Sequence, residues 1–114
     1  PSEPGFWDHM SIQPEMADKA ANPIDRWSER VISALATTCD GRALFPFGVP
    51  PRPFITWALR SGRAWASPVG LLVHDEAGLM VSYRGAILVP EVLAHHQASA
   101  SPCDTCVDQP CLSA

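Results

Sequence analysis

The clearest periodic pattern in the chain predicts a helix that begins at Asn22 and Pro23. Asparagine is a common cap before the first turn of a helix, and proline is well tolerated inside that turn. Large apolar residues then recur at spacings of three and four, as on one face of a helix. They are Ile24, Trp27, Val31 and Leu35, with Ile32 beside them. We therefore expect a helix that buries this stripe and ends near Thr38.

A second, shorter helix is predicted over residues 53–60, with Phe54, Trp57 and Ala58 facing inward. Gly62 follows it, and glycine commonly ends a helix because it adopts left-handed backbone angles at low cost. Residues 42–47 form a short apolar run, which we expect to be a buried strand. Residues 48–53 hold three prolines and are expected to form a stiff loop.

A β-hairpin is predicted in the second half of the chain. Residues 69–74 and 79–89 are rich in side chains that favour strands, and residues 75–78 between them make a four-residue turn containing glycine. Gly85 is expected to mark a bulge. His74, at the end of the first predicted strand, is expected to have a structural role.

The two outer parts of the chain carry weaker patterns. Residues 1–22 are expected to be irregular because prolines and glycine interrupt every period, with apolar residues anchoring this arm. The anchors are Phe6, Trp7 and Met10. Residues 91–97 are expected to form a short helical turn. The fold class that follows is α/β or α+β: a small sheet including a β-hairpin, packed with two or three helices.

Composition narrows the class of protein. The chain has 114 residues, of which 46% are hydrophobic and 18% charged, and this balance argues against disorder. Its net charge is -4, from 12 acidic and 8 basic residues, the opposite of what a duplex-binding protein normally carries. No apolar run approaches the roughly 20 residues of a membrane helix. We therefore expect neither a nucleic acid nor a membrane as partner.

Three of the four cysteines lie within nine residues near the C-terminus, in the pattern C-x2-C-x4-C. They are Cys103, Cys106 and Cys111. A disulfide scaffold would spread its cysteines along the chain, so this clustering favours metal or cluster binding in a reducing compartment such as the cytoplasm. A zinc site completed by His95 or His96 and a redox dithiol remain alternatives. Cys39, far away in sequence, is expected to be a small buried residue at a helix end.

The cysteine pattern, with Pro110 before the third cysteine, resembles that of the ferredoxin-type electron-transfer subunits of molybdopterin oxidoreductases. The common spacing there has two residues fewer between the second and third cysteines. The bacterial [4Fe-4S] run has a fourth cysteine after three intervening residues, followed by proline. The resemblance therefore implies a [4Fe-4S] cluster on Cys103, Cys106 and Cys111, with the fourth ligand just beyond Ala114. We expect the chain to be part of a longer protein, truncated at both ends.

The resemblance extends upstream over about residues 60–114. The stretch from Ala66 to His74, the turn at 75–78 and the stretch from Leu79 to Leu88 look like the region before the cluster motif in epoxyqueuosine reductase-like proteins. The N-terminal stretches resemble a group of uncharacterised bacterial ferredoxin-like proteins. They are residues 3–7, 23–28 and 43–48. This implies an α/β redox or pocket domain over residues 1–98, with an irregular N-terminal arm. An incomplete ferredoxin-like cysteine segment over residues 99–114 follows it.

Three functions follow from these observations. The leading hypothesis is a ferredoxin-like iron–sulfur protein that transfers electrons to a redox partner. The second is a cluster-dependent reductase of the epoxyqueuosine reductase type, acting on a small molecule, so that an enzyme here would be an oxidoreductase. Its pocket is predicted along the stiff aromatic loop, at Phe45, Phe47, Arg52 and Trp57. The third is a structural zinc module that mediates an interaction.

Overall fold

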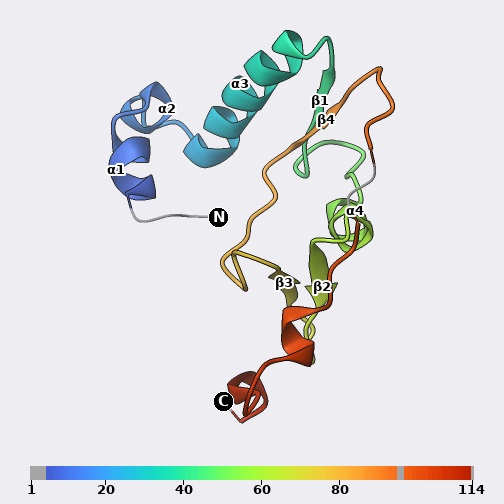
Figure 1. The fold of residues 1–114 in the computed structure, drawn as a ribbon. Coiled ribbons are helices and arrows are strands. Elements are labelled where there is room, and N and C mark those ends of the chain that lie inside the picture. The colour runs from blue at the N-terminus through green and yellow to red at the C-terminus, as the bar shows by residue number, and fades with distance from the viewer. Residues whose placement is uncertain (1–4, 95–96, 114) are drawn as a thin grey trace. The chain divides into compact units, whose positions relative to one another are not determined.

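The computed structural model describes residues 5–94 and 97–113, which form helices and antiparallel strands (Figure 1). The chain divides into two units. The α3 unit holds residues 2–52 and 83–93, and the hairpin unit holds residues 53–82 and 94–114. Within the described residues there are four α-helices and two sheets of two strands each. The fold is therefore a small mixture of α and β structure, as the sequence predicted.

The long helix of the α3 unit, α3, spans Pro23–Thr38 and confirms the first prediction. Its buried side differs in part from the predicted one. Ser28 and Ala36 are buried, whereas Val31 and Leu35 are 38% and 53% exposed. Ile24 and Ile32 continue the Ser28–Ala36 line at a spacing of four. The predicted stripe was wrong at Val31 and Leu35, whereas Ile24, Trp27 and Ile32 are partly buried. Small residues, which let a strand approach closely, mark the most covered face of this helix.

Two short helices replace the irregular arm predicted for residues 1–22: α1, Phe6–Ser11, and α2, Pro14–Ala17. Pro14 begins α2 rather than breaking it, because the N–H that proline lacks would have no partner within the first helical turn. Met10 is fully buried, and the Phe6 ring meets the Trp27 ring edge-on with centroids 6.2 Å apart. The expected apolar anchoring of this arm is therefore present, except that Trp7 is exposed.

The sheet of the α3 unit pairs strands that lie far apart in sequence. Strand β1, Arg42–Leu44, runs antiparallel to β4, Ala86–Leu88. Strand β1 is three residues long and partly buried, so the prediction of a buried strand over 42–47 was right in place and too long. A Cβ placed on Gly85 would lie 2.6 Å from Cδ1 of Ile32. The glycine therefore allows the chain entering β4 to lie directly against α3.

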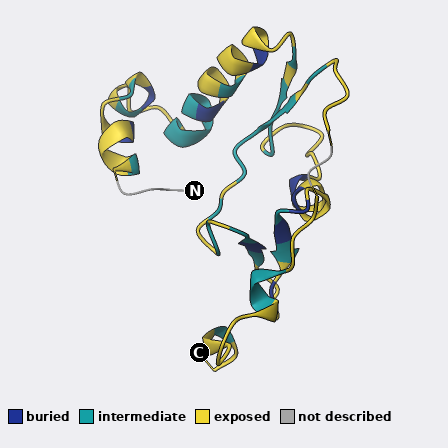
Figure 2. Cartoon of the chain, in the orientation of Figure 1, coloured by how far each residue is buried: buried dark blue, intermediate teal, exposed yellow. Residues whose placement is uncertain are grey.

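The helix of the hairpin unit, α4, spans Phe54–Arg60 and confirms the second helix prediction. Phe54 and Ala58 are buried as expected, while Trp57 is 36% exposed. Gly62 lies just beyond the helix with φ of +75°, the left-handed angle expected for a glycine that ends a helix. Figure 2 shows the buried positions of this unit on α4 and on the strands beside it.

The β-hairpin of this unit joins different strands from those predicted. Strand β2, Ala64–Ala66, pairs antiparallel with β3, Leu72–His74, and the predicted partner over 79–89 contributes β4 to the other unit. The loop between β2 and β3 is closed by Ser67, whose hydroxyl accepts from Leu71 N and whose N–H donates to Leu71 O. The turn at 75–78 closes only an isolated bridge between His74 and Gly78.

One further prediction was wrong. The described part of the predicted helical turn at 91–97 contains no helix, and residues 95 and 96 lie outside the described residues. Among the described residues, no helix is long and apolar enough to cross a membrane.

Candidate metal centre

The cysteine segment, residues 99–114, contains two short 3₁₀ turns: η1, Pro102–Asp104, and η2, Pro110–Leu112. Cys103 lies in η1, Cys111 lies in η2, and Cys106 lies on the stretch between them. All three thiols are free, with Cys106 exposed and the other two partly buried. Each turn has proline in its first position, which favours this local geometry because the ring fixes φ.

Two of the cysteines belong to one tight turn. The hydroxyl of Ser101 accepts a hydrogen bond from Cys103 N at 3.2 Å, which caps the start of η1. Cys106 N then donates to Cys103 O at 3.4 Å. The C-x2-C spacing therefore folds locally, with both cysteines at the ends of one four-residue turn.

The third cysteine follows a reversal of the backbone. Asp108 and Gln109 both have left-handed φ angles, 63° and 37°, and Leu112 N donates to Gln109 O to close η2. Among the described residues, no three His, Cys, Asp or Glu side chains are grouped to hold a metal ion. The ligand type fits a cluster or zinc, but this arrangement does not bring Cys111 to the other two cysteines as a ligand set.

The other predicted metal ligands do not complete the site. His95 and His96, expected as zinc ligands, lie outside the described residues. Cys39 lies at the C-terminal cap of α3 as expected, but it is exposed, so the prediction of a buried residue was wrong. It belongs to the α3 unit, whereas the other three cysteines belong to the hairpin unit.

The cysteine segment is attached to the hairpin unit at Gly62. Ser99 N donates to Gly62 O at 3.4 Å. A Cβ built on Gly62 would lie 2.9 Å from Cα of Ala98, closer than such atoms can approach. The backbone leading to the cysteines therefore lies directly on the end of α4, and only glycine leaves room for it there.

The four predicted pocket residues are divided between the units. Phe45, Phe47 and Arg52 belong to the α3 unit and Trp57 to the hairpin unit. The Phe45 and Phe47 rings stack with centroids 5.3 Å apart, and the Arg84 guanidinium lies 5.9 Å from the centre of the Phe47 ring. The aromatic loop thus packs on itself and on an arginine within its own unit.

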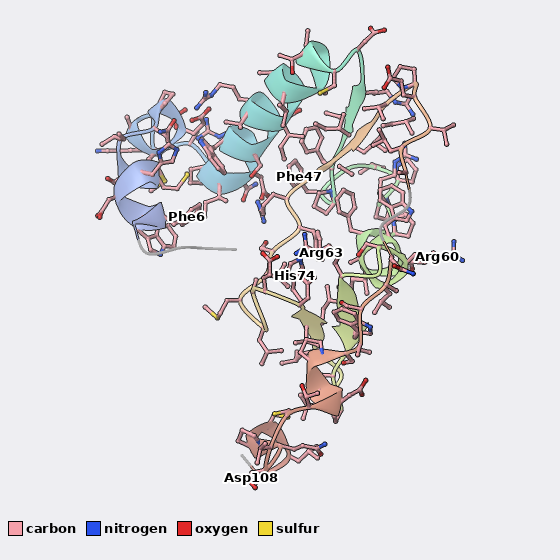
Figure 3. The ribbon with its side chains drawn as sticks, in the orientation of Figure 1. Phe6, Phe47, Arg60, Arg63, His74 and Asp108 are labelled. Carbon is pink, nitrogen blue, oxygen red and sulfur yellow. The ribbon has the colours of Figure 1, made fainter. Side chains whose placement is uncertain are left out.

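Arg84 and Arg63 each bind a carboxylate. Arg84 donates to Asp25 Oδ1 and to the hydroxyl of Ser28. Figure 3 labels Arg63 and His74 in the hairpin unit. Arg63 donates from Nε and Nη2 to the two oxygens of Asp75 at 2.8 and 3.0 Å. These hydrogen bonds hold the pKa of Asp75 below its usual range, with the Arg63 contact as the largest cause.

Sequence reasoning missed the Arg63 cluster. In the sequence, Asp75 and Glu76 look like ordinary polar turn residues. Nothing in their spacing indicates that Arg63, on the other side of a hairpin, contacts both carboxylates. Arg63 Nη2 also donates to Glu76 Oε1 at 2.6 Å, and Asp75 Oδ1 lies 2.9 Å from Nδ1 of His74. The pairing of β2 with β3 is what brings these residues together.

Comparison of the chain with protein-family models, with curated proteins and with solved structures gives no match. The functional interpretation therefore depends on the residues of this chain.

Proposed function

We propose that the cysteine segment binds an iron–sulfur cluster of the [4Fe-4S] type and that the chain transfers single electrons. The observation that carries this proposal is the set of three free thiols at Cys103, Cys106 and Cys111, two of them on one turn. Iron–sulfur clusters are held by cysteine thiolates, and C-x2-C turns recur among their binding sequences.

The three cysteine thiols are free and accessible, which fits cluster binding better than it fits a disulfide or a place in a buried core. Cys106 is exposed and the other two thiols are only partly buried, so iron can reach all three. Binding requires the Cys111 turn to close onto the Cys103–Cys106 turn. A bound cluster would supply one-electron chemistry, and the three cysteines would hold it and set its exposure to solvent.

A four-iron cluster has four ligand positions, and these cysteines supply three. The fourth position needs a ligand from outside this set of three. A small thiol in solution can occupy the same position in an experiment on this chain. This makes the proposal testable with the protein of 114 residues.

The surroundings of the cysteines favour a basic redox partner. Asp104 and Asp108 lie on the exposed part of the segment, and the sequence has no lysine or arginine after Arg84. Complementary charge speeds the encounter of two proteins and is screened by salt. The reducing cytoplasm, which keeps such thiols free, is the compartment that we propose.

Anaerobic reconstitution with iron, sulfide and a small thiol tests the proposal. We expect broad visible absorbance together with bound iron and sulfide in equal amounts. Changing Cys103, Cys106 or Cys111 to serine should abolish both, whereas Cys39→Ser should leave them unchanged. Cys39 is a matched control because it is an exposed free thiol in the other unit.

Two outcomes would overturn the proposal. The first is stoichiometric zinc with no bound iron, which would assign the segment to a structural zinc site. The second is iron uptake that survives all three serine substitutions, which would place the iron elsewhere on the chain.

A further inference from the structure

The loop from His74 to Gly78 contains one ring nitrogen with two incompatible sets of partners. Nδ1 of His74 accepts hydrogen bonds from Glu76 N and from Ala77 N, each at 3.2 Å. The same nitrogen lies 2.9 Å from Oδ1 of Asp75. A neutral Nδ1 lone pair can accept from the two amides, whereas a protonated Nδ1 can only donate, and a carboxylate oxygen can only accept.

We propose that Nδ1 of His74 is a proton-operated switch for this loop. In the neutral form the ring proton is on Nε2, and Nδ1 caps the amides of Glu76 and Ala77. When Nδ1 takes up a proton it donates to Asp75 Oδ1, and Ala77 N–H loses its acceptor. Histidine is the side chain suited to such a change between about pH 5 and 8.

The neighbouring charges allow both states. Glu76 N also donates to Asp75 Oδ1 at 2.9 Å, so this amide keeps an acceptor after protonation. Arg63 donates to Asp75 Oδ2 and to Glu76 Oε1, and can keep both bonds while the protonated His74 ring shares Oδ1 with Glu76 N and Arg63 Nη2. Arg63 also lowers the pKa of Asp75, which keeps the carboxylate ionised and ready to accept.

The backbone around the ring limits the change to a few atoms. His74 N donates to Gly78 O at 2.9 Å, and Gly78 N donates to His74 O at 3.1 Å, so the two ends of the loop stay joined. Asp75 N donates to Arg63 O at 3.1 Å and holds the loop to the start of β2. The amide of Ala77 is therefore the group that protonation should release.

Nuclear magnetic resonance of the whole chain tests the switch. As the pH is lowered, we expect a range over which the His74 ring changes from protonation on Nε2 alone to protonation on both nitrogens. The protection of the Ala77 amide, corrected for intrinsic exchange, should fall about threefold to tenfold over the same range, as expected for one lost hydrogen bond. The Gly70 amide, which donates to Ser67 O, should not change and serves as internal control.

A His74→Asn variant provides the matched comparison. The Oδ1 atom of asparagine is bonded to Cγ, as Nδ1 is in histidine. This oxygen can accept from the same amides and does not take up a proton. We expect the pH dependence of Ala77 protection to disappear in this variant. The proposal is overturned if the neutral ring carries its proton on Nδ1, or if wild-type Ala77 does not respond while His74 titrates. These wild-type spectra decide the matter even if the variant fails to fold.

Discussion

Replacing Gly62 by alanine should release the cysteine segment from the end of α4. Gly62 has φ of +75°, and an added Cβ would lie 2.9 Å from Cα and 3.0 Å from Cβ of Ala98. Neither of these atoms is the end of a flexible side chain, so the backbone itself must move. Gly70 offers a matched control, because its φ of +78° is nearly the same and a Cβ there would meet nothing within 4 Å.

The unfolding free energies of the two variants should differ only by the steric clash with Ala98. A side chain held in the left-handed region costs about 1–2 kcal/mol, and both variants carry this cost. Overpacking against a fixed backbone costs a further ~1–3 kcal/mol, and only the Gly62 variant carries this cost. We therefore expect Gly62→Ala to lose about 2–5 kcal/mol of unfolding free energy and Gly70→Ala about 1–2 kcal/mol.

Urea unfolding followed by amide resonances measures this difference within the hairpin unit. Leu71 and Asp75 are suitable probes, since their N–H groups donate to Ser67 Oγ and Arg63 O. In Gly62→Ala, the Ser99 amide should also lose protection. Equal losses of stability in the two variants, with Ser99 still protected, would show that the Gly62–Ala98 contact does not hold the segment in solution.

Three further predictions concern the α3 unit. Met10→Ala should cost about 2–5 kcal/mol in urea unfolding, because the side chain is fully buried; a loss below 1 kcal/mol or so would contradict this burial. Gly85→Ala should cost about 1–3 kcal/mol by pressing on Ile32, and adding Ile32→Val, which removes Cδ1, should recover part of that loss. Independent, additive losses in the double variant would argue against this contact. The pKa of Glu15 is lowered, first by its hydrogen bond from Arg30, so its contribution to stability is complete above the unfolded pKa and is lost as pH falls through the lower folded value. Unfolding of Glu15→Gln should therefore depend less steeply on acid than that of the wild type, and identical pH profiles would refute the pairing.

Local sequence signals predicted the helices that are long enough for the helical spacing of their apolar residues to be recognised. Asn22 and Pro23 mark the start of α3 as predicted, although Asn22 adopts a left-handed φ and makes no side-chain cap. Pro14 misled the prediction, because the same residue that interrupts a helix also begins one. The C-x2-C turn is equally local. The Ser101 cap and the backbone hydrogen bond from Cys106 N to Cys103 O form it within six residues.

Strand pairing could not be predicted in the same way. Each strand is three residues long, and three residues carry no period that selects a partner. Residues 72–74 look able to pair with the β-rich stretch that follows, yet they pair with residues 64–66. The Ser67 side chain, by closing the loop after β2, helps to decide this. The Arg63–Asp75 contact is a consequence of that pairing and was therefore also missed.

The sequence by itself determined the class of fold, the place of α3 and α4, and the spacing of the three cysteines. These are properties of neighbouring residues, governed by backbone preference and hydrogen bonds over a few positions. Tertiary structure decided which side of α3 is buried, which strands pair, and which carboxylates Arg63 and Arg84 bind. The physical reason is that close approach depends on the partner surface: Ser28, Ala36 and Gly85 mark contacts because they are small, and only the folded chain shows what they touch.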